Sequence, residues 1–184
     1  MEKDEAEGIM ETGFNHFDKE GNAVMVDVSE KKTTSRVACA QGKIRVSKEI
    51  LKAVREHSAS KGDVLGVARI AGIMGAKRTP ELIPLCHPLM LSHISVDFTI
   101  DEENCEIISC CTVGLEGKTG VEMEALCGVS ASLLTIYDMC KAMDKHMVIS
   151  DIHLVYKEGG KSGRFTFDKE DTEGKNESSG DYGK

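Results

Sequence analysis

A carboxylate and two amines recur at helical spacing near the end of a long apolar segment. Asp138 and Lys141 stand three residues apart, and Lys145 follows four residues later. On one helix these side chains share a face, where an acid and an amine can transfer protons if apolar surroundings shift their pKa values. The many apolar neighbours leave little face for water. The open alternative is a solvated stripe of charge, the usual meaning of such a pattern.

Two further carboxylates, Glu122 and Glu124, follow the glycine-rich segment 117–120. An extended backbone places both on one side, whereas a helix would set them about 200° apart. The flanking glycines favour the extended form. Paired carboxylates can accept hydrogen bonds from the N1–H and exocyclic amine of a guanine edge. The alternative is that both are first-turn acids that complement a helix dipole.

The Gly-Lys-Thr string at 117–119 looks like the end of a phosphate-binding P-loop. That motif requires a glycine five residues before its last glycine, but Thr112 occupies this position and Gly114 is out of register. The segment is therefore interpreted as a strand-to-helix turn or as a backbone loop that places the next residues against a ligand.

His87 lies in a proline-framed segment, directly after Leu85 and Cys86. A Cys-His doublet suggests zinc, but adjacent residues rarely bind one ion together, and no second pair stands at ligand spacing. A histidine in a rigid frame is better suited to contact a phosphate or a base. A surface histidine without a role is the alternative.

Cationic side chains that could bind phosphate are spread along the chain and include Arg36, Lys61 and Lys157. Each one alone is more often a solvated surface group than a ligand. The glycine-rich stretch 157–163 differs in kind, because its backbone N–H groups and lysines can converge on a phosphate.

The chain has 184 residues and a net charge of -8, which is confined to its ends. Residues 1–22 hold seven acids and two bases, residues 168–184 hold six acids and three bases, and residues 23–167 balance to zero. We therefore expect one catalytic domain over 23–167, a flexible acidic tail before it and a disordered acidic tail after it. A neutral domain can still hold a cationic pocket for an anionic ligand.

Composition excludes several classes of protein. Aromatic residues make up only 4% and tryptophan is absent, which argues against binding single-stranded nucleic acid by stacking. No apolar run is long enough to span a membrane. Seven cysteines without a Cys-x-x-Cys pair, and no basic-then-apolar leader, predict reduced thiols in the cytoplasm.

These candidates are distributed over an alternating series of strands and helices. Expected strands cover 36–46, 93–100, 105–113 and 152–156, with an extended piece at 164–167; expected helices cover 49–57, 64–77 and 125–143; expected loops cover 79–88 and 114–120. Ser47 is the expected N-cap of the first helix. Gly66, Gly72 and Gly75 lower the helix propensity of the second and indicate close packing against another element. The order of elements is that of an α+β ferredoxin-like split β-α-β sandwich, with an antiparallel sheet and helices packed on one face.

Several long strings, spread in order over residues 25–167, resemble the cyclic pyranopterin monophosphate synthase family. They are KGDV at 61–64, ARIAGI at 68–73, AKRT at 76–79, LIPLCHPL at 82–89, GKTGVEMEAL at 117–126, LTIYDMCKA at 134–142 and GGKSG at 159–163. Strings of this length and order are far more specific than any single short motif.

The resemblance implies a lyase of molybdenum cofactor biosynthesis. Its substrate is a cyclised dihydro-GTP, which is rearranged to cyclic pyranopterin monophosphate with loss of diphosphate. Position by position, the resemblance implies that Lys61 and Lys141 are acid–base lysines and that Asp138 is the active-site carboxylate. The implied substrate contacts are Leu85, Cys86, His87, Glu122, Met123, Glu124, Arg36 and Lys157, with Glu122 on the guanine side and Arg36, His87 and Lys157 facing the triphosphate.

The resemblance also implies a ferredoxin-like fold and a homo-oligomer, a hexamer built as a trimer of dimers with sites at subunit boundaries. No cofactor and no metal are expected, because the reaction moves protons but no electrons. The alternative is a catalytically silent module that binds a purine nucleotide and regulates a partner. Intact Lys61, Asp138 and Lys141 argue against that alternative. A zinc-dependent hydrolase is a more distant third.

Overall fold

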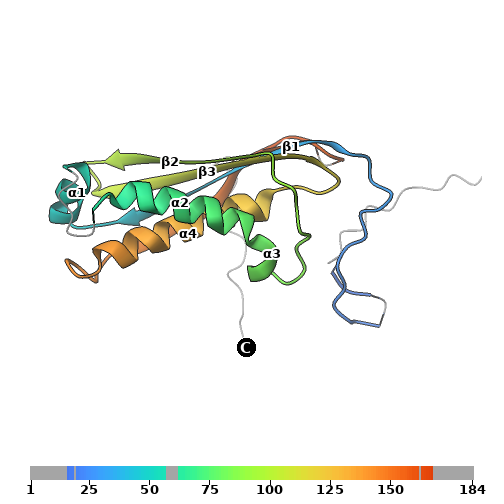
Figure 1. Cartoon of the computed structure of the whole chain (residues 1–184), viewed down its shortest axis with the longest axis horizontal. Coiled ribbons are helices and arrows are strands. Elements are labelled where there is room, and N and C mark those ends of the chain that lie inside the picture. The colour runs from blue at the N-terminus through green and yellow to red at the C-terminus, as the bar shows by residue number, and fades with distance from the viewer. Residues whose placement is uncertain (1–15, 19, 57–61, 162, 168–184) are drawn as a thin grey trace, which may run out of the picture.

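A five-stranded antiparallel sheet carries the helices on one face (Figure 1). The computed structural model describes residues 16–18, 20–56, 62–161 and 163–167. Its elements are β1 (Thr34–Arg45), α1 (Lys48–Arg55), α2 (Val64–Lys77), α3 (Thr79–Leu82), β2 (His93–Asp101), β3 (Glu106–Gly117), α4 (Glu122–Cys140), β4 (Val148–Glu158) and β5 (Phe165–Thr166). The strand order β2-β3-β1-β4-β5 confirms the ferredoxin-like prediction.

Alternation along the central strand β1 separates the two faces of the sheet. Ala38, Ala40 and Ile44 are fully buried against the helices, whereas Cys39 and Lys43 between them point to the other face and are partly exposed. The core therefore lies between the sheet and α4. Its largest fully buried side chains include Ile44, Ile107, Val113, Leu133 and Ile136.

Short side chains at the crossing of α2 and α4 let the two helices approach closely. A Cβ added at Gly72 would lie 2.9 Å from the backbone oxygen of Gly128, and one added at Gly75 would lie 2.6 Å from the Cβ of Ala131. The predicted close packing is thus confirmed for Gly72 and Gly75. It is wrong for Gly66, whose added Cβ would meet only the Asp63 side chain that caps the same helix.

Local signals account for the ends of several elements. Ser47 is the N-cap of α1, as predicted, and its hydroxyl accepts a hydrogen bond from the Ile50 amide at 3.3 Å. The turn between β2 and β3 is closed by Asp101, which accepts bonds from both the amide and the side chain of Asn104. Within the described residues, no helix is long and apolar enough to cross a membrane.

Several boundaries differ from the prediction, among them those of β4, which spans Val148–Glu158 rather than 152–156. β3 continues through the expected loop to Gly117, because its pairing with β1 extends to the Thr34–Gly117 position and supplies ladder hydrogen bonds. A short helix, α3, stands where a proline loop was expected, and Pro80 fits its first turn because no amide donor is needed there. α4 begins at Glu122 and ends at Cys140, three residues earlier at each end than predicted.

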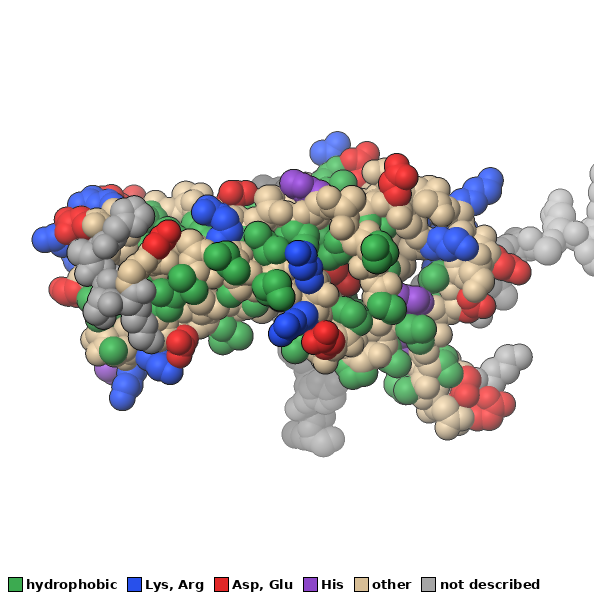
Figure 2. All heavy atoms as spheres, in the orientation of Figure 1, with side chains coloured by type: hydrophobic (Ala, Val, Ile, Leu, Met, Phe, Trp, Pro, Cys, Tyr) green, Lys and Arg blue, Asp and Glu red, His purple; other side chains and the backbone are tan. Residues whose placement is uncertain are grey.

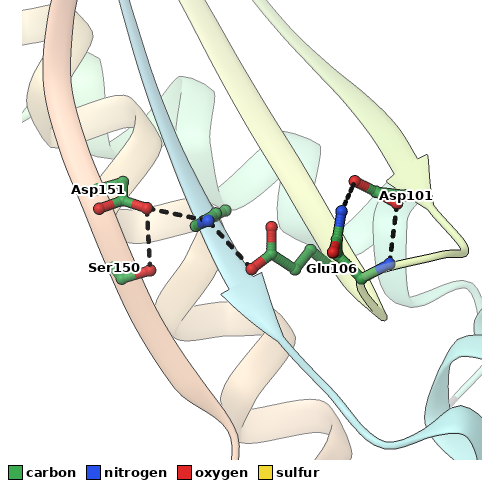
Figure 3. A network of polar contacts seen from close by, with 6 residues as sticks. Asp101, Glu106, Ser150 and Asp151 are labelled. Atoms are coloured by element: carbon green, nitrogen blue, oxygen red, sulfur yellow. Dashed lines mark hydrogen bonds and ion pairs between the residues drawn. The ribbon is translucent and has the colours of Figure 1, made fainter. Parts of the chain in front are cut away.

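On the face away from the helices, an ion-pair network ties three strands together. The Lys43 amine on β1 lies 3.0 Å from the carboxylates of both Glu106 on β3 and Asp151 on β4. Figure 3 shows these two acids converging from opposite sides, with Ser150 and Asp101 nearby. The network holds the register of the central strands on the side that the helices leave uncovered.

Candidate functional site

A cleft of about 1170 Å³ opens at one end of the sheet, beside the start of α4. Four parts of the chain line it: the segment before β1, the first part of β1, the loop before α4, and the end of β4 with the loop that follows. The lining residues are Asp27, Glu30, Lys31, Lys32, Thr34, Arg36, Val37, Lys118, Thr119, Gly120, Val121, Glu122, Lys157, Glu158, Gly159, Gly160 and Lys161. Six of these side chains are cationic and four are acidic. The cleft therefore has an excess of positive charge in a domain that is neutral as a whole.

Arg36 is a partly buried cation of this cleft. Its Nη2 donates to the carbonyl of Lys118 at 3.4 Å, while its Nε is buried and has no hydrogen-bond partner among the described residues. Gly159 and Gly160 adopt φ values of 102° and 78°, and a side chain on Gly160 would overlap the guanidinium. The two glycines thus let the loop after β4 lie directly against Arg36. A buried, unsatisfied guanidinium N–H is suited to an anionic oxygen.

Glu122 and Lys157 form an ion pair inside the cleft. The Lys157 amine donates to Glu122 Oε1 at 2.8 Å, and both side chains are largely shielded, with 26% and 29% exposure for Lys157 and Glu122. Lys157, Gly159, Gly160 and Lys161 of the glycine-rich stretch 157–163 all line the cleft.

The extended geometry expected for Glu122 and Glu124 is wrong. Both residues lie in the first turn of α4, which begins directly after the buried Val121, so their side chains point in different directions. Glu122 faces Lys157 in the cleft, whereas Glu124 is only 3% exposed. The alternative, in which both acids belong to the first turn of a helix, is therefore the correct one.

Glu124 is a buried acid beside the proline-framed segment. Burial raises its pKa above the ordinary value, and the charge of Glu122 acts in the same direction. Burial raises the pKa of the Cys86 thiol, and the charge of the nearby Glu124 carboxylate raises it further. The structure thus places Cys86 next to the start of α4, although the two lie far apart in the sequence.

His87 lies near the same cleft but is not among the residues that line it. Hydrogen bonds from Ser29 lower the pKa of Asp27, and the charges of Lys118 and His87 contribute to that lowering. Since Asp27 lines the cleft, His87 lies near it. Of the remaining candidates in this region, Leu85 is half-buried and Met123 is 36% exposed.

Asp138 and Lys141 form an ion pair at the opposite end of α4. The Lys141 amine lies 2.6 Å from Asp138 Oδ1, and the side chains of Lys141 and Asp138 are 51% and 60% exposed. Hydrogen bonding to Asp138 raises the pKa of Lys141. The expected apolar wall around this pair is therefore absent, since neighbouring Leu134 is itself 60% exposed. Lys145 does not continue the stripe, because the helix ends at Cys140.

The two groups of candidates are far apart within one chain. Sixteen residues of helix separate Glu122 from Asp138, which at 1.5 Å per residue is roughly 24 Å. α2 runs antiparallel to α4, so its first residue, Val64, lies at the Asp138 end of the molecule (Figure 1). Lys61, which precedes α2 in the sequence, falls outside the described residues, as does most of both acidic tails.

Some lining residues were not indicated by any sequence pattern. Asp27, Lys31 and Lys32 belong to a segment without regular structure, which approaches the cleft because the Lys118 amine donates to the carbonyl of Ser29 at 2.6 Å. Lys118 belongs to the Gly-Lys-Thr sequence that resembles the end of a P-loop. In this structure its hydrogen bond holds the segment before β1 against the cleft. Among the described residues, no group of three or more His, Cys, Asp or Glu side chains could hold a metal ion.

The fold and the cleft define a ferredoxin-like α+β domain with a cationic site at the start of α4. Residues 25–160 match the model of the MoaC family. The chain is 59% identical over 156 residues to the cyclic pyranopterin monophosphate synthase of Clostridium botulinum strain Alaska E43, covering 85% of this chain and 98% of the relative. It is 58% identical over 158 residues to the enzyme of the same name from Clostridium perfringens strain SM101, covering 86% of this chain and 100% of the relative. It is 55% identical over 154 residues to that of Rhodospirillum rubrum, covering 84% and 93%. The chain belongs to the MoaC family.

Proposed function

We propose that this protein is a lyase of molybdenum cofactor biosynthesis that converts cyclised dihydro-GTP to cyclic pyranopterin monophosphate and diphosphate. The observation that carries the proposal is the presence, in one cleft, of an excess of cations together with the Glu122 carboxylate at the start of α4. The substrate has the matching ends, because its triphosphate favours cations and its guanine-derived edge offers N–H donors. Relatives that share more than half of the residues carry the name of this activity.

The cleft supplies the substrate-binding half of the proposed site. Arg36, Lys157 and His87 are assigned to the triphosphate. The buried Nε of Arg36 supports this assignment because it has no hydrogen-bond partner among the described residues. Glu122 and Glu124 are assigned to the guanine-derived edge. A Glu124 carboxyl with a raised pKa can be protonated and donate as well as accept. Leu85, Cys86 and Met123 complete the assigned contacts.

Lys61, Asp138 and Lys141 are assigned to proton transfer. Forming the cyclic phosphate joins a hydroxyl oxygen to the innermost phosphorus and expels diphosphate, so one proton must leave that hydroxyl and no electron is exchanged. A lysine acts as the base only when its pKa falls toward neutrality. In a single chain Asp138 raises the pKa of Lys141, but cations of a neighbouring cleft would lower it.

The separation of the two halves supports a site shared between subunits. Asp138 lies roughly 24 Å from Glu122 along α4 in the same chain, so we assign the proton-transfer group of one subunit to the cleft of another. Apolar side chains gather over the helices in Figure 2, and the exposed ones include Val67, Ile70, Met74 and Leu134. Such a surface favours burial against another subunit. The proposed assembly is a hexamer built as a trimer of dimers, located in the cytoplasm.

Turnover tests the proposal directly. Purified protein given the cyclised dihydro-GTP should release diphosphate and form a product that oxidises to a fluorescent pterin. Lys61→Ala and Lys141→Ala should each reduce turnover by about a thousandfold without unfolding the protein, whereas Lys52→Ala, an exposed lysine of α1, should not change it. Tight binding of the substrate without any turnover by the assembled protein would contradict the lyase and favour a silent nucleotide-binding module.

A further inference from the structure

Two cysteines face each other across the central strands, on the side of the sheet away from the helices. Cys39 on β1 and Cys110 on β3 have their sulfur atoms 2.9 Å apart, and both residues are half-buried. In the strand register Cys39 stands opposite Thr112, and Cys110 stands opposite Gln41, so the two thiols form a diagonal cross-strand pair. Neither residue belongs to the cleft or to the Asp138 pair.

Strand alternation isolates this pair from the other cysteines nearby. Cys111 follows Cys110 directly, but its side chain is fully buried on the helix side. Cys105, also half-buried, lies in the turn before β3. The geometry therefore selects one partner for Cys39.

The two thiols share their protons unequally. The contact between the two sulfurs lowers the pKa of Cys39 to about 6 and raises that of Cys110. The Thr112 hydroxyl adds to the lowering at Cys39. The other titratable groups facing the pair are Asp97 from β2, whose charge acts on Cys110, and Tyr156 from β4, the register partner of Cys39. Cys39 therefore has the character of an attacking sulfur, and Cys110 that of the sulfur that resolves the product.

We propose that Cys39 and Cys110 are a reversible oxidation site that reacts with hydroperoxides to form a disulfide between β1 and β3. A disulfide bond is about 2.05 Å long, so the two sulfurs, now 2.9 Å apart, need to approach by about 0.9 Å. Because diagonal cross-strand neighbours stand roughly 7–8 Å apart, closing the bond also draws β1 and β3 slightly together.

The chemistry of this site balances with hydrogen peroxide as the oxidant. The Cys39 thiolate attacks one peroxide oxygen, the O–O bond breaks, and a sulfenic acid forms on Cys39 as hydroxide leaves. The Cys110 sulfur then attacks the Cys39 sulfur, the S–O bond breaks, and water leaves with the proton from Cys110. Two thiols lose two electrons in total, and one peroxide is reduced to two waters.

Peptide mapping of the full chain tests the site. The reduced, assembled protein is treated with one equivalent of hydrogen peroxide, its remaining thiols are alkylated, and it is digested without reductant. We expect the Cys39 and Cys110 peptides to be linked within one chain, about tenfold faster than Cys105 is modified, and to be released by a thiol reductant.

Variants separate the two roles. Cys39→Ser should abolish the linked peptide, Cys110→Ser should leave a sulfenic acid on Cys39 that dimedone traps, and the control Cys105→Ser should keep the link. A Cys39 that stays free to alkylate after peroxide treatment of the unaltered protein would overturn the proposal, as would links that join two chains or other cysteines. That measurement needs no variant to fold.

Discussion

Glu124 shows how folding changes the chemistry of a single residue. The sequence presents it as one of two equivalent acids, but α4 directs it inward, where it is 3% exposed, while Glu122 stays in the cleft beside Lys157. Burial raises the pKa of Glu124 and so favours its neutral carboxylic acid. Two residues apart, the fold thus provides an acid paired with Lys157 and a buried acid whose pKa is raised.

Because folding raises the pKa of Glu124, the folded state binds its proton more tightly than the unfolded state does. Its contribution to stability is complete below the ordinary value of 4.5 and is lost as the pH rises through the folded value. Glu124→Gln should therefore stabilise the protein at pH 7, on the order of 1 kcal/mol, and leave its stability unchanged near pH 4.

Urea unfolding at both pH values measures this effect. Glu122→Gln is the matched control, because it removes a partner of Lys157 and should not stabilise the protein. Equal effects of Glu124→Gln at pH 7 and pH 4 would contradict the assignment of a buried, proton-binding acid. If Glu124 also contacts substrate, as proposed, the stabilised variant should lose turnover.

At the scale of elements, the crossing of α2 and α4 determines where the ends of both helices lie. The crossing is close because Gly72 and Gly75 present no side chain to the backbone and Cβ atoms of α4. Close-packed interiors do not absorb an added methyl group without displacement. The antiparallel run of these helices then brings the start of α2 to the Asp138 end of the molecule.

Gly75→Ala should push α2 away from α4, because its Cβ would lie 2.6 Å from that of Ala131. We expect the free energy of unfolding to fall by about 1–3 kcal/mol. Gly66→Ala in the same helix is the matched control, because its added Cβ would meet the capping Asp63 side chain and not α4, so the gain in helix propensity offsets any loss of the cap. Equal unfolding midpoints for the two variants, measured in urea, would show that the crossing tolerates a methyl group.

At the scale of the whole molecule, the cleft and the Asp138–Lys141 pair occupy opposite ends of α4. The proposed reaction needs both groups. In the proposed assembly, each chain therefore contributes its cleft to one site and its Asp138–Lys141 pair to another. A symmetric dimer can bring each cleft against the helix end of its partner and thereby complete two sites at once.

Mixed assemblies test this arrangement. Lys157→Ala damages the cleft and Lys141→Ala damages the proton-transfer group, so a dimer of one of each has one intact site and one doubly damaged site. Random pairing on co-expression should restore about a quarter of the unaltered turnover. Lys157→Ala mixed with Arg36→Ala should restore none, because both changes damage the same half. If mixed assemblies, purified through two different tags, stay inactive in the first combination, the sites are not shared.

The sequence by itself determined the order of elements, the α+β class and the family resemblance. These properties follow from local signals, each of which depends on residues a few positions apart. Examples are the period-two alternation in β1 and β3, the cap at Ser47 and the helical run from Val64. The boundaries at Gly117 and Glu122 were missed because strand pairing with β1 and burial of Val121, both long-range effects, decide them.

Only the tertiary structure decided which candidates share a site. Arg36, Glu122 and Lys157 meet because β1 and β4 pair side by side and α4 begins against them, and no spacing in the sequence expresses that register. The same holds for the burial of Glu124 and for the contact between the Cys39 and Cys110 sulfurs. Local periodicity indicates which face of a helix or strand a residue occupies. The pKa of that residue and its contact partners depend on the residues that the fold places next to it, which can be far away in the sequence.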